Sequence, residues 1–271
     1  MAIMRKAVLF TVSLVFSIAT CSQTGGSARE ACETKHSVFF GDGTLDEYTT
    51  STWDKALTRV NNEARYSASG AMLEQVEFAY NDDKGYKTAK LTRDVESRLK
   101  NRIVYQYNPQ GQLFRESLVD KDGKVVSTYE YTYDSKGNQI SRVMKNRQGV
   151  PLAETAYTYD TAGKMITSET KNAAGGRISS TKYTYDNQGN LINQQVTNAE
   201  GKVTSVINSV FQSGREMKNE VAAPDGSIQM RVTNEYGTNG ELTKKTIENF
   251  QGDSKQFIRY EYVFRPARRQ S

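Results

Sequence analysis

The chain has 271 residues, with 36 Lys and Arg against 31 Asp and Glu, and its net charge is +5. Hydrophobic residues make up 37% and the mean hydropathy is −0.68, so we expect a thin or well-hydrated protein with a modest core. Sixteen Tyr and ten Phe exclude a disordered chain. The charge is too small and too evenly spread for a nucleic-acid partner, whose binders cluster Lys and Arg on one face.

Residues 1–20 have the features of a signal peptide. Arg5 and Lys6 form a short basic region, and the apolar run AVLFTVSLVFSIAT follows it. This run is too short to cross a bilayer core of about 30 Å as a helix, and it has the length of a signal-peptide core. We therefore expect an exported protein, periplasmic or at the cell surface of a bacterium.

Cys21 stands where a bacterial lipoprotein signal places its acylated cysteine, although Thr20 replaces the usual Ala or Gly. One expectation is lipidation of Cys21, which anchors the protein to a membrane and leaves Cys32 alone. The other is ordinary cleavage after Ala19 or Ala28. After cleavage at Ala19 the two cysteines can pair in an oxidising compartment. Both cysteines precede the repeats, so no disulfide staples the body of the protein.

The body of the chain is a tandem repeat with a period of 26 residues. The stretch YTYD occurs at 131–134, 157–160 and 183–186, and YQYN occurs at 105–108. Two interleaved glycine series share this spacing: Gly111, Gly137, Gly163 and Gly189, and Gly123, Gly149, Gly175 and Gly201. After one deletion near FQSGRE the pattern continues to YEYVF at 260–264. Upstream, FAYNDDKGY is a copy with one extra residue, and we interpret TWDKAL and FFGDG as eroded copies. The repeats therefore extend over residues 37–264.

Each unit predicts a β-hairpin followed by a second turn. The order Asp-x-x-Gly favours a type I turn closed by a residue with positive φ, which Gly137 adopts without steric cost. Asp134 can accept a hydrogen bond from the backbone two residues on. Between turns lie about ten residues rich in β-branched and aromatic types, a strand of roughly 33 Å.

Because the period is even, every copy presents the same side chains on the same face, and tyrosines two residues apart share a face. The predicted result is a ribbon of tyrosines across the sheet, continued by Phe211, Tyr236, Tyr260 and Tyr262. In one interpretation this ribbon is the surface on which the hairpins stack. In the other it is a platform for sugar rings or a peptide strand. The candidate platform residues are Tyr105, Tyr107, Tyr131, Tyr133, Tyr157, Tyr159, Tyr183 and Tyr185.

One segment, LTRDVESRLKNRI, departs from the strand pattern. Leu91, Val95, Leu99 and Ile103 recur every four residues, which is helical spacing. Aligned to the repeat, residues 94–97 fall where the second turn belongs. We predict a degenerate turn here in preference to an inserted helix, and further strands in residues 33–77.

The tandem YxYDxxGxL with a second glycine half a unit on resembles the YD or RHS repeats of bacterial surface and toxin-shell proteins. The resemblance covers about residues 78–264 and implies a β-hairpin array in an exported protein. The chain is smaller than those proteins, and Asn138, Lys164 and Asn190 stand where an Arg is frequent. No core-closing or toxin region follows the repeats, so the resemblance implies little about activity.

The residue types that carry most enzyme and metal chemistry are scarce. His36 is the one histidine, which excludes His-based triads and His-rich metal sites. The clustered oxygens of DKDG at 120–123 and NDD at 81–83 suit turns better than a calcium loop. No phosphate-binding glycine motif follows a strand, and no carboxylate pair is singled out for glycoside hydrolysis. We predict no enzyme activity, no metal and no cofactor.

The sequence predicts an all-β fold, an antiparallel meander of 14–18 strands in a long twisted or curled sheet. Its regions are a signal peptide (1–20), a flexible tether (21–36), a β-repeat domain (37–264) and a basic tail (265–271). We expect a lipid-anchored envelope protein that binds a glycan or an envelope or host protein, or scaffolds, without catalysis. The alternative is an outer-membrane β-barrel, although the strands lack an aliphatic lipid-facing row and both turn series are short. A third option is a fragment of an RHS-type shell.

Overall fold

The computed structural model describes residues 21–23 and 29–266, all of whose regular elements are β-strands, so the predicted all-β fold is confirmed. The predicted signal peptide (1–20) lies outside the described residues, as do residues 267–271 of the predicted tail. The strands are β1 Cys21–Gln23, β2 Arg29–Phe40, β3 Leu45–Trp53, β4 Val60–Ser67, β5 Met72–Tyr80, β6 Lys87–Arg93, β7 Leu99–Tyr107, β8 Leu113–Asp120, β9 Val125–Tyr133, β10 Gln139–Lys145, β11 Pro151–Tyr159, β12 Met165–Asn172, β13 Arg177–Tyr185, β14 Leu191–Asn198, β15 Val203–Gln212, β16 Arg215–Ala222, β17 Ile228–Tyr236, β18 Leu242–Asn249 and β19 Ser254–Pro266.

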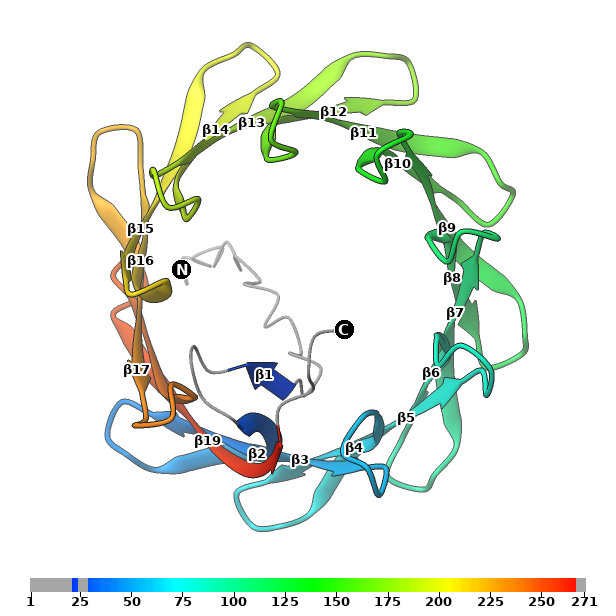
Figure 1. The fold of residues 1–271 in the computed structure, drawn as a ribbon, viewed down its shortest axis with the longest axis vertical. Coiled ribbons are helices and arrows are strands. Elements are labelled where there is room, and N and C mark those ends of the chain that lie inside the picture. Colours follow the sequence, from blue (N-terminus) through cyan, green and yellow to red (C-terminus); the bar gives the residue numbers. More distant parts are fainter. Residues whose placement is uncertain (1–20, 24–28, 267–271) are drawn as a thin grey trace, which may run out of the picture.

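The sheet curls until it closes on itself. From β2 onward each strand pairs antiparallel with the next, and β19 pairs with β2, so that 18 strands form a barrel (Figure 1). The short β1 pairs only with β2 and lies inside the ring when the barrel is viewed along its axis. Closure removes the sheet edges that an open meander of this length would expose.

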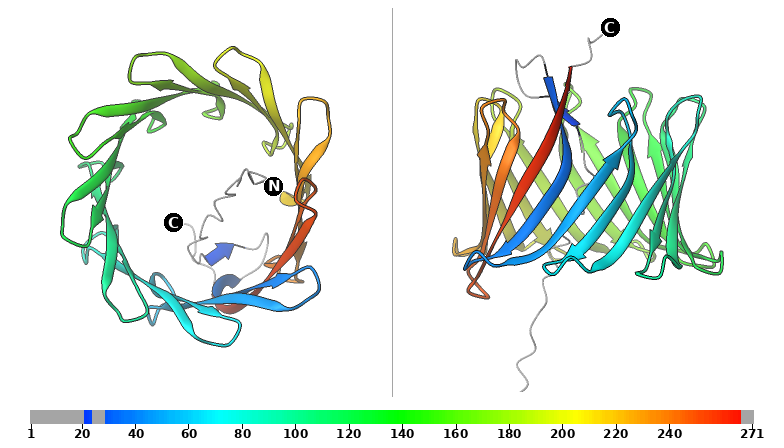
Figure 2. Two further views of the ribbon diagram at one scale, coloured as in Figure 1. Left: turned by 180° about the vertical axis from the view of Figure 1, so that it is seen from behind. Right: turned by 90° about the horizontal axis from the view of Figure 1, so that it is seen from below.

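The turns form two rims, which we name from the right panel of Figure 2. The upper rim holds β1, the end of β19 and the turns that follow odd-numbered strands, such as β9–β10. The lower rim holds the turns that follow even-numbered strands, such as β8–β9. All turns are short, from two residues (213–214) to six (54–59), so neither rim carries long loops.

The turn chemistry predicted from the repeat is present. Asp134 Oδ1 accepts hydrogen bonds from the backbone N–H groups of Lys136 (2.9 Å) and Asn138 (2.8 Å), and Gly137 has a φ of +88°. Residues 94–98 are a turn between β6 and β7, which confirms the degenerate turn over the helix. Ser97, with a φ of +63°, takes the place of the glycine there.

Nearly every even-numbered strand begins with a β-bulge. In the β9–β10 hairpin, Tyr133 is opposite Gln139 and Thr132 is opposite Ser141, so Ile140 is an extra residue. Bulges occur at the corresponding places in the other repeats, for example between Gln106 and Tyr107 against β8. A bulge interrupts the ladder and leaves backbone groups that need other partners.

The seam between the first and last wall strands is the longest pairing, from Gln256 opposite Phe40 to Pro266 opposite Arg29. Residues 29–36 therefore belong to the wall, where the sequence suggested a tether over 21–36, and β19 continues to Pro266, past the predicted end at 264. The difference arises because these residues pair with β19, 224 to 237 positions along the chain, once the barrel closes.

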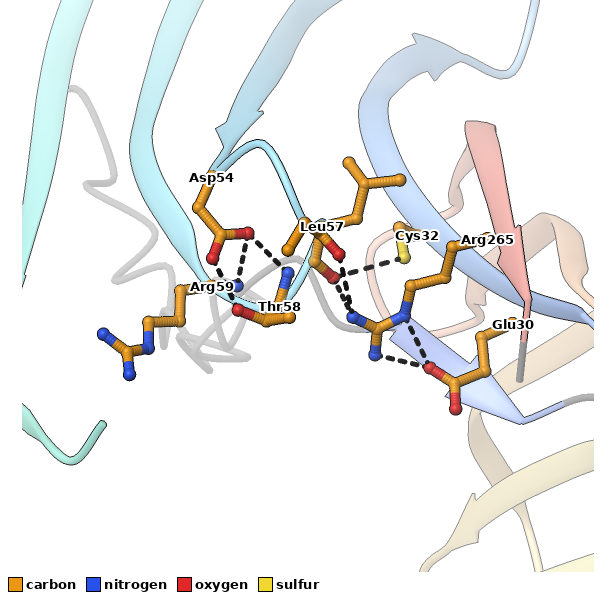
Figure 3. Close-up of polar contacts among 8 residues, drawn as sticks. Glu30, Cys32, Asp54, Leu57, Thr58, Arg59 and Arg265 are labelled. Atoms are coloured by element: carbon orange, nitrogen blue, oxygen red, sulfur yellow. Dashed lines mark hydrogen bonds and ion pairs between the residues drawn. The ribbon is translucent and has the colours of Figure 1, made fainter. Parts of the chain in front are cut away.

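Buried polar contacts reinforce the upper end of the seam (Figure 3). The Arg265 guanidinium binds the Glu30 carboxylate and donates to the carbonyl oxygen of Leu57 in the β3–β4 turn. Cys32 is fully buried and disulfide-bonded, and Cys21 is opposite it in the β1–β2 register. The seam is thus tied both to β1 and to the neighbouring turn.

Candidate functional site: the tyrosine-bearing inner wall

The two faces of the barrel wall differ in exposure. Tyr183 and Tyr185 are half-buried, whereas Thr184 between them is exposed, and Thr132 and Thr158 are likewise exposed between half-buried tyrosines. Side chains on the concave side of a curved sheet converge and cover one another, while those on the convex side diverge. The tyrosine-bearing face is therefore the inner wall, and the threonine-bearing face is the outer wall.

All eight candidate platform tyrosines lie on the inner wall, on β7, β9, β11 and β13. They do not form the continuous ribbon expected from the sequence, because an even-numbered strand separates each pair from the next. The second tyrosine of each pair is the last residue of its strand and stands at the upper rim. Four further tyrosines occupy equivalent inner positions: Tyr80, Tyr236, Tyr260 and Tyr262.

The second tyrosine of each pair has a defined structural partner. Its hydroxyl donates to the backbone carbonyl 20 residues earlier, at the bulge that opens the preceding even-numbered strand. This bond occurs six times, at 2.6–2.9 Å: Tyr80–Val60, Tyr133–Leu113, Tyr159–Gln139, Tyr185–Met165, Tyr236–Glu216 and Tyr262–Leu242. Tyr107 departs from the pattern and stacks on Tyr86, with ring centroids 4.9 Å apart.

The first tyrosine of each pair contacts side chains of the preceding strand. Tyr131 donates to Glu116 Oε2 at 3.3 Å, and the Tyr183 and Ser168 hydroxyls lie 3.0 Å apart. Burial, with the Glu116 carboxylate nearby, raises the pKa of the Tyr131 hydroxyl far above its usual value, so it stays a neutral donor. Nearby on the same wall, the Arg142 guanidinium lies 5.3 Å from the centre of the Tyr129 ring.

Aromatic stacking between repeats, which the sequence suggested, occurs between Tyr86 and Tyr107 but does not recur through the four tyrosine pairs. Within the described part of the chain, none of the eight platform tyrosines stacks on another of the eight. Hydroxyls that bind bulge carbonyls join the hairpins instead. A ligand at the inner wall would therefore meet the ring faces of Tyr133, Tyr159 and Tyr185, whose hydroxyls are already occupied. The platform itself stays a prediction.

The rest of the inner wall is polar and uncharged over long stretches. Thr155 and Ser168 are buried, on strands beside the tyrosines, and Asn234 donates to the Glu216 carbonyl oxygen at 2.8 Å. Aromatic rings beside hydroxyl and amide groups suit a ligand that offers both apolar faces and hydrogen-bonding groups, as a sugar does.

The outer wall carries ladders of opposite charges. Glu130 accepts from Lys145 (2.6 Å) and Arg115 (2.8 Å), and these two cations hold the pKa of the Glu130 carboxyl below its usual value. Near the seam a longer ladder crosses four strands, with neighbouring charges 2.7–3.9 Å apart: Lys218, Glu220, Arg231, Glu248 and Lys255. Sequence reasoning missed these ladders because their cross-strand partners lie 7 to 17 residues apart and meet only once the register is set.

Two absences within the described residues bear on the site. No cluster of three His, Cys, Asp or Glu side chains is placed to hold a metal ion in residues 21–23 and 29–266. In the same part of the chain there is no helix with the length and apolarity to cross a membrane. His36 lies on β2 with its Nδ1 2.8 Å from Glu33 Oε1, in a half-buried position.

No family model matches the chain, and no curated protein matches it. Among solved structures it is similar to TcdB2-TccC3-Cdc42, at 14% identity and a TM-score of 0.36 over 87% of this chain and 17% of that one. It is also similar to porin-like proteins from Bacteroides uniformis (12% identity, TM-score 0.45) and Bacteroides vulgatus (12%, 0.34), each over 85% of this chain and 98% of theirs. The chain thus spans less than a fifth of the first structure. Likenesses at these TM-scores carry no argument about function.

Proposed function

We propose that this chain is an exported, non-catalytic β-barrel of the bacterial envelope, and that its inner wall is the binding or scaffolding surface. The closed wall, short turns at both rims and tyrosine rings beside hydroxyl and amide groups support a binding role. The ligand class that this surface suits best is a glycan, with an envelope or host protein as the second class. The recurring YxYDxxG unit supports kinship with YD or RHS repeats.

The closed barrel has the architecture that an outer-membrane β-barrel requires, and it supports that second proposal better than an open sheet would. Eighteen antiparallel strands of 7 to 13 residues can span a bilayer when tilted, since about 9–11 residues suffice. Export through a signal peptide agrees with either setting.

The outer wall is the observation that guides our choice of setting. Glu130 and Arg115 project from the convex face between the two rims, with Lys145 at the lower-rim end of β10, and a lipid-facing Arg or Lys near the midplane costs roughly 2–4 kcal/mol. Ion pairing with Glu130 lowers that cost, but the exposed Thr132 and Thr158 add further polar surface to the outer wall. We therefore propose that water, and not lipid hydrocarbon, surrounds the barrel wall.

The test of the setting is extraction of the full-length exported protein from the envelope. We expect a β-rich, monodisperse species released without detergent, by osmotic shock or, if Cys21 is acylated, by cleavage of the anchor. A protein that leaves the membrane fraction only in detergent, and that shows heat-modifiable gel migration, would favour the outer-membrane barrel.

The test of the surface is a glycan array probed with the purified protein and two matched variants. Tyr157→Ala removes an inner-wall ring, and Thr158→Ala changes the adjacent outer-wall residue. We expect Tyr157→Ala alone to lose binding. If both variants bind as the parent does, the inner wall is not the binding surface, whatever the setting of the barrel.

A further inference from the structure

Exposed aliphatic side chains gather at three neighbouring hairpin tips of the lower rim. These tips, β8–β9, β10–β11 and β12–β13, form what we call the rim arc. Its aliphatic side chains are 39–53% exposed: Val125, Val126, Val150, Leu152 and Ile178. Lower-rim hairpins splay outward from the barrel wall in the side view (Figure 2), which brings such tips to the periphery.

The rim arc is also the basic part of an otherwise acidic rim. Residues within four positions of Gly123, Gly149 and Gly175 carry a net charge of +4. The other six lower-rim turns, counted in the same way around Gly43, Gly70, Ser97, Gly201, Gly226 and Gly252, sum to −5. Positive charge and exposed aliphatic surface therefore coincide in the rim arc, and Leu73, Val95 and Phe250 are exposed at other tips of this rim.

A groove on the outer wall opens beside these tips. Its volume is about 440 Å³, and its lining includes Arg115, Lys145, Arg147, Val125 and Gly149. The Nε–H group of Arg115 is buried without a hydrogen-bond partner, while its Nη2 binds Glu130 at 2.8 Å.

Two carboxylates moderate the charge of the groove. Glu130, which lines the groove, neutralises part of the charge of Arg115 and Lys145, and Asp120 lies 3.4 Å from Arg147. The remaining excess is cationic, so the groove favours a singly charged anion over a cation or a neutral group.

We propose that the rim arc docks on the surface of an anionic phospholipid bilayer. The aliphatic tips enter the interfacial region, and a headgroup phosphate occupies the groove beside Arg115 and Arg147. Amphipathic surfaces with basic residues beside aliphatic ones bind such interfaces through buried apolar area together with attraction to anionic lipid. A protein partner would need a matching concave apolar surface, whereas a bilayer accepts separate tips on one plane. This docking is peripheral and does not depend on what the inner wall binds.

The experiment is co-sedimentation of the full-length mature protein with vesicles of phosphatidylcholine alone or mixed equally with phosphatidylglycerol. We expect binding to the anionic vesicles. Added salt should weaken this binding, because salt shortens the distance over which the protein's cations attract the anionic surface. Val150→Asn with Ile178→Asn should reduce it at least tenfold. The matched control, Ile140→Asn with Ile166→Asn, changes two exposed aliphatic residues next to upper-rim turns and should bind as the parent does.

The charge is tested separately. Lys124→Gln and Arg147→Gln should each weaken binding about fivefold, since a Lys or Arg near an anionic surface contributes about 1 kcal/mol. Lys202→Gln, on the same rim outside the arc, should not. Circular dichroism of every variant shows whether the fold is intact.

Four outcomes would overturn the proposal. They are no vesicle binding, equal binding to neutral vesicles, an equal loss in the upper-rim control, and binding that resists alkaline carbonate extraction and so reflects insertion. A dimer in sedimentation velocity that Val150→Asn dissolves would instead assign the arc to a second copy of the chain.

Discussion

The hydroxyl of Tyr133 donates a hydrogen bond to the backbone carbonyl of Leu113, 2.7 Å away. Leu113 opens β8, and the next residue, Phe114, is the extra residue of the bulge there. The bulge interrupts the ladder at this carbonyl, and the tyrosine that reaches it belongs to the following hairpin. In six places a repeat thus supplies the group that completes the backbone hydrogen bonding of the repeat before it.

This relationship predicts which tyrosines stabilise the barrel through their hydroxyl groups. Tyr133→Phe and Tyr159→Phe keep the ring but leave the carbonyls of Leu113 and Gln139 without that donor. We expect each change to lower the free energy of unfolding by about 0.5–1.5 kcal/mol. Urea denaturation followed by far-UV circular dichroism measures the loss.

The control is Tyr157→Phe, on the same strand and the same face as Tyr159. No hydroxyl bond to a bulge carbonyl is found for Tyr157 in the described residues, so its replacement should change the unfolding free energy by a few tenths of a kcal/mol at most. Equal losses at positions 157 and 159 would show that hydroxyl bonding to the bulge does not join the repeats.

The turn aspartates predict acid sensitivity. A hydrogen bond from the Asn138 side chain, followed by backbone N–H donors, holds the pKa of Asp134 below its usual value, and Asn190 does the same for Asp186. A carboxyl with a depressed folded-state pKa stabilises the fold above its unfolded pKa of about 3.9, and that stabilisation is lost as pH falls through the folded value. The melting temperature should therefore fall on acidification below about pH 4.

Asp134→Asn with Asp186→Asn tests this cause, because the chain itself uses Asn146 in the same turn position. The Asn146 Oδ1 accepts from the backbone N–H groups of Gln148 and Val150 at 3.0 Å, as an aspartate would. The double variant should keep its turns at neutral pH and lose part of its acid sensitivity. An unchanged pH profile of the melting temperature would assign the acid response to other groups.

Ser97 offers a stabilising substitution. It has a φ of +63° where the aligned turns have glycine, and a left-handed conformation costs a residue with a Cβ about 1–2 kcal/mol. Ser97→Gly should raise the free energy of unfolding by up to about 1 kcal/mol, and Gly123→Ser, with a φ of +82° in the next turn of this rim, should lower it by a similar amount. Thermal unfolding of the pair measures both; a loss of stability in Ser97→Gly would contradict the assignment.

The repeat made the strands predictable, since period, turn glycines and the Asp-x-x-Gly order are local signals. These signals also predicted the degenerate turn at 94–98. The glycine spacing indicated a turn there, although the apolar residues recur with helical spacing. Closure was not predictable from local signals, because it depends on β2 pairing with β19 more than two hundred residues away. The sequence pattern predicted a twisted or curled sheet and did not distinguish between these two shapes.

The candidate site was predictable only in part, because local signals place side chains on a face but do not show their long-range contacts. The even period and the two-residue spacing placed the tyrosines on one face, as observed. Nothing in a 26-residue period shows that the Tyr133 hydroxyl binds the Leu113 carbonyl instead of packing on a neighbouring ring. The rim arc was not predictable from residue position. Leu45, Val203 and Ile228 also follow a lower-rim glycine by two residues, and they differ from Val125, Val150 and Ile178 only in being less exposed.

The final prediction concerns the two uses open to Cys21. Cys32 is disulfide-bonded, Cys21 is the other cysteine of the sequence, and the two are opposite each other in the β1–β2 register. A sulfur in a disulfide cannot also carry a diacylglyceryl group, so pairing and lipid anchoring exclude each other. Intact-mass spectrometry of the exported protein, with and without reduction, should show the loss of two hydrogens on oxidation and no lipid. Cys32→Ser should then lower the free energy of unfolding by about 3 kcal/mol, since the bond closes a short loop beside the seam. A mature chain that begins at a lipid-modified Cys21, with an unaltered melting temperature in Cys32→Ser, would establish the anchor instead.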